Sequence, residues 1–151
     1  STCAMKLRKE KSLTSSILVF VKTNPFKELN SQYSPFQKVV LDVPTNDSME
    51  ITSQALSVLK RIYKDGFNYK KAGVIVGDIV SEESRQLSLF HTKDIFKTKN
   101  IMNAMDDINR KMGRNKVRLA VQGFDRKWRL KQEKLSPCYT TRFEDVLEVK
   151  I

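Results

Sequence analysis

Histidine, cysteine and glycine are scarce in this chain of 151 residues. The single histidine, His91, excludes a zinc site built on two histidines. The two cysteines, Cys3 and Cys138, lie near opposite ends, so they give no disulfide framework and fit a reducing cytoplasm. Gly73 and Gly77 flank a strand-like stretch but lack the helix and lysine of a phosphate loop. We therefore expect no metal site and no nucleotide cofactor.

Long hydrophobic runs and catalytic constellations are also absent. The longest apolar run, residues 17–21, is strand-sized, far below the roughly 20 residues of a membrane span. No nucleophile–base pair supports a small hydrolase. The acidic pairs Glu82/Glu83 and Asp106/Asp107 are adjacent in sequence, and neighbours on a helix do not share a face. Solvated charge is the simpler interpretation, and we expect no catalytic residue.

Positively charged residues outnumber negatively charged ones in this chain, with 28 Lys and Arg against 17 Asp and Glu. The formal net charge is +11 and the isoelectric point about 9.7, which favours a polyanion such as nucleic acid as partner. Simple solubility is the alternative, although a small domain usually carries a charge of about 2 to 8. Residues 1–91 hold 13 Lys and Arg against 9 Asp and Glu, and residues 92–151 hold 15 against 8. The shorter part therefore carries more of the excess.

The first half predicts an α+β module. The expected order is a helix over 2–11, strands over 16–23 and 37–43, a helix over 48–65 and a strand over 72–80. Asp47 and Glu50 form a capping-box pattern at the second helix, and Gly66 is a natural stop. One face of that helix is apolar, with Ile51, Ala55, Val58, Leu59 and Ile62. This order is a split βαβ pattern with its first strand missing.

The periodicity fades after residue 80. We interpret 81–99 as an exposed linker and 100–151 as a second, small α+β module. In that module we expect a helix from Asn100 to Gly113, a strand over 116–121 with a hairpin partner over 124–130, and a short strand over 146–149. The apolar face expected for this helix consists of Ile101, Met105, Ile108 and Met112.

The linker contains the most informative peptide: Gln86, Leu87, Ser88, Leu89 and Phe90. In an extended chain Leu89 and Phe90 point apart and can fill two apolar sub-pockets of a partner. The Gln86 amide can both donate and accept a hydrogen bond, which sets the register. A short buried strand or turn between the modules is the competing interpretation.

The peptide matches the bacterial sliding-clamp-binding pattern Gln-Leu-x-Leu-Phe. It follows residues 69–78 (Tyr-Lys-Lys-Ala-Gly-Val-Ile-Val-Gly-Asp), which resemble the last strand of the little-finger domain in UmuC-like, Y-family translesion DNA polymerases. Residues 20–26 resemble an earlier strand of that domain, and residues 44–48 the turn into its second helix. Beyond the linker, Gln122-Gly123, Trp128 and residues 135–142 resemble the C-terminal module of UmuC proteins.

The resemblance implies a division into a truncated little finger over 1–80, a clamp-binding linker over 81–99 and a UmuC-type module over 100–151. It also implies that the catalytic carboxylates, with their Mg, belong to a palm domain that is absent here. The chain is then a non-catalytic, DNA-gripping and clamp-binding region of a polymerase of SOS mutagenesis and DNA repair. A stand-alone nucleic-acid-binding regulatory protein without polymerase activity is the alternative.

The little finger lays its sheet along the DNA backbone in that family. The expected contacts are basic and polar residues on strands and at their ends: Lys22, Thr23, Asn24, Lys38, Lys70 and Lys71. An ordinary solvated charge is the alternative for each lysine. The basic residues of the second helix, Lys60, Arg61 and Lys64, are expected to face water on the other side.

In the split βαβ arrangement the missing first strand is central. We therefore expect unpaired backbone groups in the middle of the sheet. We expect compensation either by a homodimer that exchanges elements or by a strand from the second module.

The second module is expected to contact nucleic acid or a protein partner. The candidate residues are Arg126, Lys127, Trp128, Arg129, Tyr139 and Arg142. Trp128 could stack on a base of single-stranded nucleic acid, or it could be plain core. The resemblance adds a UmuD-type accessory subunit and RecA as partners, and a bacterial cytoplasm at the nucleoid as the location.

Overall fold

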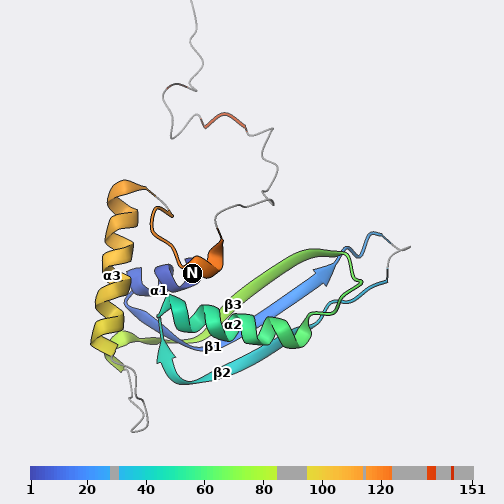
Figure 1. Cartoon of the computed structure of the whole chain (residues 1–151), viewed down its shortest axis with the longest axis horizontal. Helices are drawn as coiled ribbons and strands as arrows, with labels where there is room; N and C mark the ends of the chain where they lie inside the picture. The colour runs from blue at the N-terminus through green and yellow to red at the C-terminus, as the bar shows by residue number, and fades with distance from the viewer. Residues whose placement is uncertain (28–30, 85–94, 114, 124–135, 139–143, 145–151) are drawn as a thin grey trace, which may run out of the picture. The chain divides into compact units, whose positions relative to one another are not determined.

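The computed structural model describes residues 1–27, 31–84, 95–113, 115–123, 136–138 and 144. The elements in chain order are α1 (Thr2–Lys9), β1 (Ser12–Thr23), β2 (Phe36–Thr45), α2 (Ser48–Ile62), β3 (Tyr69–Ser81), the 3₁₀ turn η1 (Glu82–Ser84), α3 (Ile95–Met112) and the 3₁₀ turn η2 (Ala120–Gln122), as Figure 1 shows. The chain divides into two compact units, 1–118 and 119–151. The predicted α+β class and the order helix, strand, strand, helix, strand are confirmed.

The three strands form one antiparallel sheet in the order β2-β1-β3. The central strand β1 pairs with β2 on one side and with β3 on the other, so that Ile17 lies between Val39 and Val76. Its pairing with β3 extends from Ser12↔Ser81 to Thr23↔Tyr69. The expected opening in the middle of the sheet is therefore wrong for the described strands. Since β3 fills the second edge of β1, an exchanged element is not required to complete the pairing of β1.

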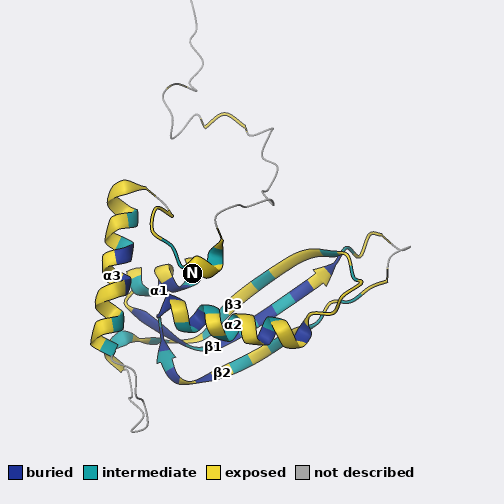
Figure 2. Cartoon of the chain, in the orientation of Figure 1, coloured by how far each residue is buried: buried dark blue, intermediate teal, exposed yellow. Residues whose placement is uncertain are grey.

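The core lies between one face of this sheet and the helices α1 and α2. Alternate β1 residues point toward the helices, as the period of two requires, and α2 packs against β1 and β2 (Figure 2). The buried core cluster consists of Ala4, Leu7, Ile17, Val19, Val21, Leu41, Ile51, Val58 and Ile62. The expected apolar face of α2 is confirmed. Asp47 caps this helix, because its Oδ1 accepts a hydrogen bond from the Met49 N–H at 2.9 Å.

Several element ends differ from the sequence prediction. Strand β2 continues through Pro44, which was expected to end it, because β2 is an edge strand and a proline there needs no ladder partner for its nitrogen. Strand β1 begins at Ser12, four residues earlier than expected, and its register with β2 shifts between Thr14 and Ser16. Helix α2 ends at Ile62, before Gly66.

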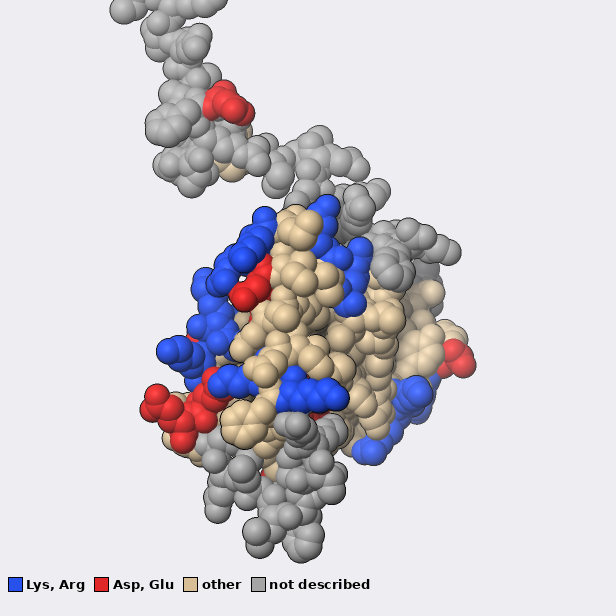
Figure 3. Space-filling view, turned by 60° about the vertical axis from the view of Figure 1, so that its left-hand side comes forward, with Lys and Arg blue, Asp and Glu red and all other residues tan. Residues whose placement is uncertain are grey.

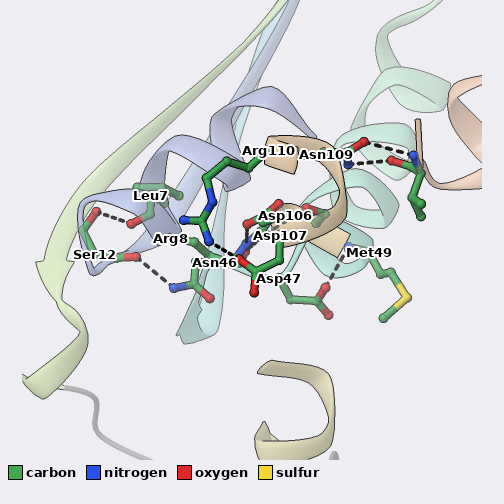
Figure 4. Close-up of polar contacts among 12 residues, drawn as sticks. Leu7, Arg8, Ser12, Asn46, Asp47, Met49, Asp106, Asp107, Asn109 and Arg110 are labelled. Carbon is green, nitrogen blue, oxygen red and sulfur yellow. Dashed lines mark hydrogen bonds and ion pairs between the residues drawn. The ribbon is translucent and has the colours of Figure 1, made fainter. Parts of the chain in front are cut away.

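A buried arginine joins three segments of the first unit. The side chain of Arg8 is 7% exposed, and its guanidinium donates to both carboxylate oxygens of Asp106, at 2.6 and 2.9 Å (Figure 4). It also donates to the Asn46 carbonyl at 2.7 Å and to the Ser48 hydroxyl at 3.0 Å. Arg8 therefore ties α3 to α1 and to the start of α2. Asp107 instead pairs with Arg110 on the exposed side of α3.

Helix α3 begins earlier and faces differently than expected. It starts at Ile95, so the expected cap at Asn100 is wrong, and it ends before Gly113, which has a φ of +102°. Met102 and Met105 are buried, whereas Met112 is 67% exposed. Because Asp106 must reach Arg8, the helix is rotated away from the expected apolar face, and Ile101 and Ile108 are exposed as well.

The strand expected over 116–121 is also wrong. The side chain of Asn109 bonds both backbone groups of Val117, accepting from its N–H at 3.0 Å and donating to its carbonyl at 2.8 Å. These bonds occupy the groups that a strand partner would use, and the segment ends in η2. The expected hairpin partner over 124–130 and the short strand over 146–149 lie outside the described residues.

No helix in the described part of the chain is long and apolar enough to cross a membrane. Within the same residues, no group of three or more His, Cys, Asp or Glu side chains is placed to hold a metal ion.

We predict that Asp106→Ala lowers the free energy of unfolding by about 3 kcal/mol, because it leaves the Arg8 guanidinium buried without its counter-charge. The matched control is Asp107→Ala, which removes an exposed ion pair three residues apart on one helix and should cost less than about 0.5 kcal/mol. Urea unfolding followed by far-ultraviolet circular dichroism measures both. Equal losses for the two variants would contradict the role assigned to Arg8.

Candidate nucleic-acid interface

The face of the sheet away from α1 and α2 carries two lysines in direct opposition. Lys22 on β1 pairs with Lys71 on β3, and both side chains are exposed. Directly opposed side chains of an antiparallel pair lie on the same face, and like charges there repel each other. No carboxylate of the described residues is within ion-pair distance of either ammonium group. The Lys22 Nζ instead lies 5.7 Å from the centre of the Phe20 ring. This pair leaves two uncompensated positive charges on the open face.

Lys38, the third expected contact on this side of the sheet, has an acidic partner. Its Nζ lies 2.9 Å from Oδ2 of Asp78, which has a left-handed backbone with a φ of +49°. The hydrogen bond from Lys38 holds the pKa of Asp78 below its ordinary value, and a hydrogen bond from Ser16 acts in the same direction. Lys38 therefore offers an anion less net charge than Lys22 or Lys71 does.

Thr23 and Asn24 shape the loop that follows β1. Thr23 is 3% exposed, and its hydroxyl donates to Gln32 Oε1 at 2.6 Å while it accepts from the Tyr33 N–H at 3.1 Å. The Asn24 Oδ1 accepts from the Phe26 N–H at 3.2 Å, which leaves the amide NH₂ of Asn24 as the donor group. The buried Thr23 therefore stabilises the loop through hydrogen bonds to Gln32 and Tyr33, whereas Asn24 is half-buried.

Lys70 is exposed at an irregularity of the sheet. The β1–β3 register shifts between Lys22 and Thr23, so that Thr23 pairs with Tyr69 and Lys70 lies in the irregular step. Beside it is a cavity of about 220 Å³, lined by Asn24, Lys27, Asn68, Tyr69 and Lys70. Sequence reasoning missed Lys27 and Asn68, although a basic residue in the first loop was a usable signal. The two come together only because both loops lie at the same end of the sheet (Figure 1).

The open face between the lysines is apolar. Phe36 is 70% exposed, Val40 68% and Ile75 55%. Phe20 pairs with Phe36 on one side and with Gly73 on the other. A Cβ at Gly73 would collide with the Phe20 ring, so the glycine allows that ring to lie across β3. The expected contacts on β1 and β3 thus border an apolar surface that none of the described residues covers.

A second gathering of positive charge lies on α3, outside the expected contact set. Figure 3, which brings α3 forward, shows Lys and Arg side chains around a neutral central area. The exposed members on this helix include Lys97, Lys99, Arg110 and Lys111. Lys99 pairs with Glu82 at 2.6 Å and Arg110 with Asp107 at 2.6 Å, so part of this charge is compensated within the chain.

The remaining expected sites lie outside the described residues. These are the clamp-binding peptide Gln86–Phe90 and the partner contacts Arg126, Lys127, Trp128, Arg129, Tyr139 and Arg142. Their roles therefore stay predictions from the sequence, as does the division into modules at residues 80 and 99.

Comparison with known proteins identifies the family. Residues 1–89 match the impB/mucB/samB family C-terminal domain, and residues 99–149 match a domain of unknown function, DUF4113. Protein UmuC of Salmonella typhimurium is 40% identical over 148 residues, which cover 97% of this chain and 35% of the relative. Protein SamB of Salmonella typhimurium is 36% identical over 149 residues, covering 98% and 35%. Protein MucB of Escherichia coli is 35% identical over 144 residues, covering 95% and 34%.

The chain spans about a third of the length of the curated relatives it matches. Its likeness to them extends through both matched regions and is not confined to the three-stranded sheet. The chain therefore belongs to the impB/mucB/samB family of UmuC-like, Y-family polymerases and contains that family's C-terminal domain.

Proposed function

We propose that this chain is a non-catalytic, DNA-binding region of an error-prone translesion polymerase and that it grips the DNA backbone with the open face of its sheet. The observation that carries the proposal is the cross-strand pair of Lys22 and Lys71, exposed and without a carboxylate partner in the described residues. Two like charges held opposite each other are stabilised by an anion between or above them. A row of phosphates supplies such anions.

The other expected contacts differ in how much charge, or which donor group, each can offer to a phosphate. Lys70 adds a third exposed charge beside Lys71, whereas Lys38 must share its ammonium between Asp78 and a phosphate. Thr23 positions the loop from inside, and Asn24 offers its amide NH₂. Contacts of this kind hold the duplex without reading its sequence, which suits a protein that must tolerate damaged bases.

The partners form the second part of the proposal. Residues 86–90 are proposed to dock Leu89 and Phe90 into a bacterial sliding clamp, with Gln86 setting the register. Residues 126–129, Tyr139 and Arg142 are proposed to contact nucleic acid, a UmuD-type accessory subunit or RecA. Catalysis with Mg would belong to a palm domain of the whole polymerase, and the place of action would be the bacterial cytoplasm at the nucleoid.

We predict that Lys71→Gln weakens binding to a duplex about five- to tenfold and reduces the slope of log K against log salt by about 0.9, since one phosphate contact is lost. Fluorescence anisotropy with a labelled duplex at several salt concentrations measures both quantities. The control is Lys60→Gln, which removes the same charge from the exposed side of α2, across the sheet from the open face. Equal effects of the two variants would show that overall charge, and not this face, binds the DNA.

The clamp assignment predicts that the double variant Leu89→Ala, Phe90→Ala loses at least about tenfold in affinity for a bacterial sliding clamp, because two buried apolar anchors are removed. Ser88→Ala is the matched control, since position 88 is the variable position of the pattern and should tolerate the change. Surface plasmon resonance on an immobilised clamp gives both affinities. Unchanged binding of the double variant would remove the clamp from the list of partners.

A further inference from the structure

A small cavity, open to solvent, lies at the end of the sheet where the β1–β2 and α2–β3 connections meet. Its volume is about 220 Å³, and its lining consists of Asn24, Lys27, Asn68, Tyr69 and Lys70. Two lysines and two asparagines thus converge on one small space from segments more than 40 residues apart in the chain. Among the described residues, the lining contains no acidic side chain.

The first wall of the cavity is a well-bonded turn. The Lys27 N–H donates to the Asn24 carbonyl at 3.2 Å, and the Asn24 side chain accepts from the Phe26 N–H. The amide of Gln32 then donates to the carbonyls of Asn24 and Lys27, at 3.1 and 3.0 Å. The bond from the Phe26 N–H occupies the carboxamide oxygen of Asn24, so the NH₂ group of that side chain is left to serve a ligand.

The second wall is held by Tyr69. Its hydroxyl donates to the Lys64 carbonyl at 3.0 Å and accepts from the Lys64 N–H at 3.1 Å. Its ring also belongs to an aromatic cluster with Tyr33, Tyr63 and Phe67. The residues on either side, Asn68 and Lys70, are exposed, and their side chains make no hydrogen bond or ion pair within the described part of the chain. The bonds of Tyr69 therefore hold the backbone between Asn68 and Lys70, whose side chains are left as hydrogen-bond donors.

The electrostatic surroundings favour an anion. Lys22 and Lys71 lie one step further along the same end of the sheet. Lys64 adds a charge 4.9 Å from the centre of the Tyr33 ring. Asp65, the acidic residue of the α2–β3 connection, does not line the cavity; it acts on Tyr63, whose pKa its charge raises.

We propose that this cavity binds one phosphate group of a DNA strand, with the Asn24 and Asn68 amides as neutral donors and Lys27 and Lys70 as charged donors. The inference rests on the proposed DNA-binding function and deepens it by assigning a discrete phosphate site, with two residues, Lys27 and Asn68, outside the expected contact set. Donors from two walls suit a tetrahedral oxyanion, which accepts hydrogen bonds in several directions. A cationic ligand would instead be repelled by the charges of Lys27 and Lys70.

The test compares two substitutions that change charge equally. Asn68→Asp places a carboxylate in the cavity, and Asn103→Asp places one on the exposed surface of α3. Duplex binding is measured by fluorescence anisotropy over a range of salt concentrations. We expect Asn68→Asp to weaken binding about tenfold and to lower the salt slope by about 1, whereas Asn103→Asp changes affinity less than about twofold. Equal effects of the two variants would overturn the inference.

A second variant tests the site without introducing a carboxylate, and a second probe, inorganic phosphate, tests it without DNA. Lys27→Gln, a change at an exposed residue, is expected to weaken duplex binding about fivefold. Titration of the whole chain with inorganic phosphate is followed by the side-chain amide signals of Asn24 and Asn68 in nuclear magnetic resonance spectra. Saturable shifts of these two signals support the site, and their absence overturns it. If the unaltered chain binds no duplex but these signals still shift, the proposed function fails while the oxyanion site stands.

Discussion

The pairing of β1 with both neighbouring strands is the constraint on which the rest of this structure depends. Because β1 is hydrogen-bonded on both edges, the helices can pack only on its faces; α1 and α2 cover one face, and in the described part of the chain Phe36, Val40 and Ile75 stay exposed on the other. Ile17, Val19 and Val21 turn toward α1 and α2 and form the centre of the core. The same alternation places Phe20 and Lys22 on the open face, where the proposed DNA contacts lie.

A buried charge extends this unit beyond the sheet. Arg8 is hidden from water and needs partners for its guanidinium, which Asp106, Asn46 and Ser48 supply. The desolvation cost of such a group is high, so the helix that carries Asp106 is held in one orientation. As a result α3, most of which belongs to the second matched region, packs in the same compact unit as the first matched region. The chain's folding units therefore do not coincide with its matched regions.

The pairing of charges differs between the open face of the sheet and helix α3. On the open face, Lys22 and Lys71 oppose each other and Lys70 stands beside them, without carboxylates among the described residues to neutralise them. On α3, Lys99 and Arg110 are paired with Glu82 and Asp107. Paired surface charges contribute little to the attraction of a polyanion, whereas unpaired ones raise the local potential. This contrast favours the sheet face over α3 as the surface of the proposed DNA binding, although both are rich in basic residues.

The sequence by itself determined the order of the first five elements, the cap at Asp47 and the apolar face of α2, because these depend on local periodicity and on side chains close in the chain. Its motifs indicated the family, whereas the DNA contacts expected at Lys22, Lys70 and Lys71 stay predictions. Only the tertiary structure decided the place of β3 beside β1, the rotation of α3 toward Arg8 and the meeting of Lys27 with Asn68. Each of these depends on groups far apart in the chain, from 40 to almost 100 residues, and no local pattern encodes such pairings.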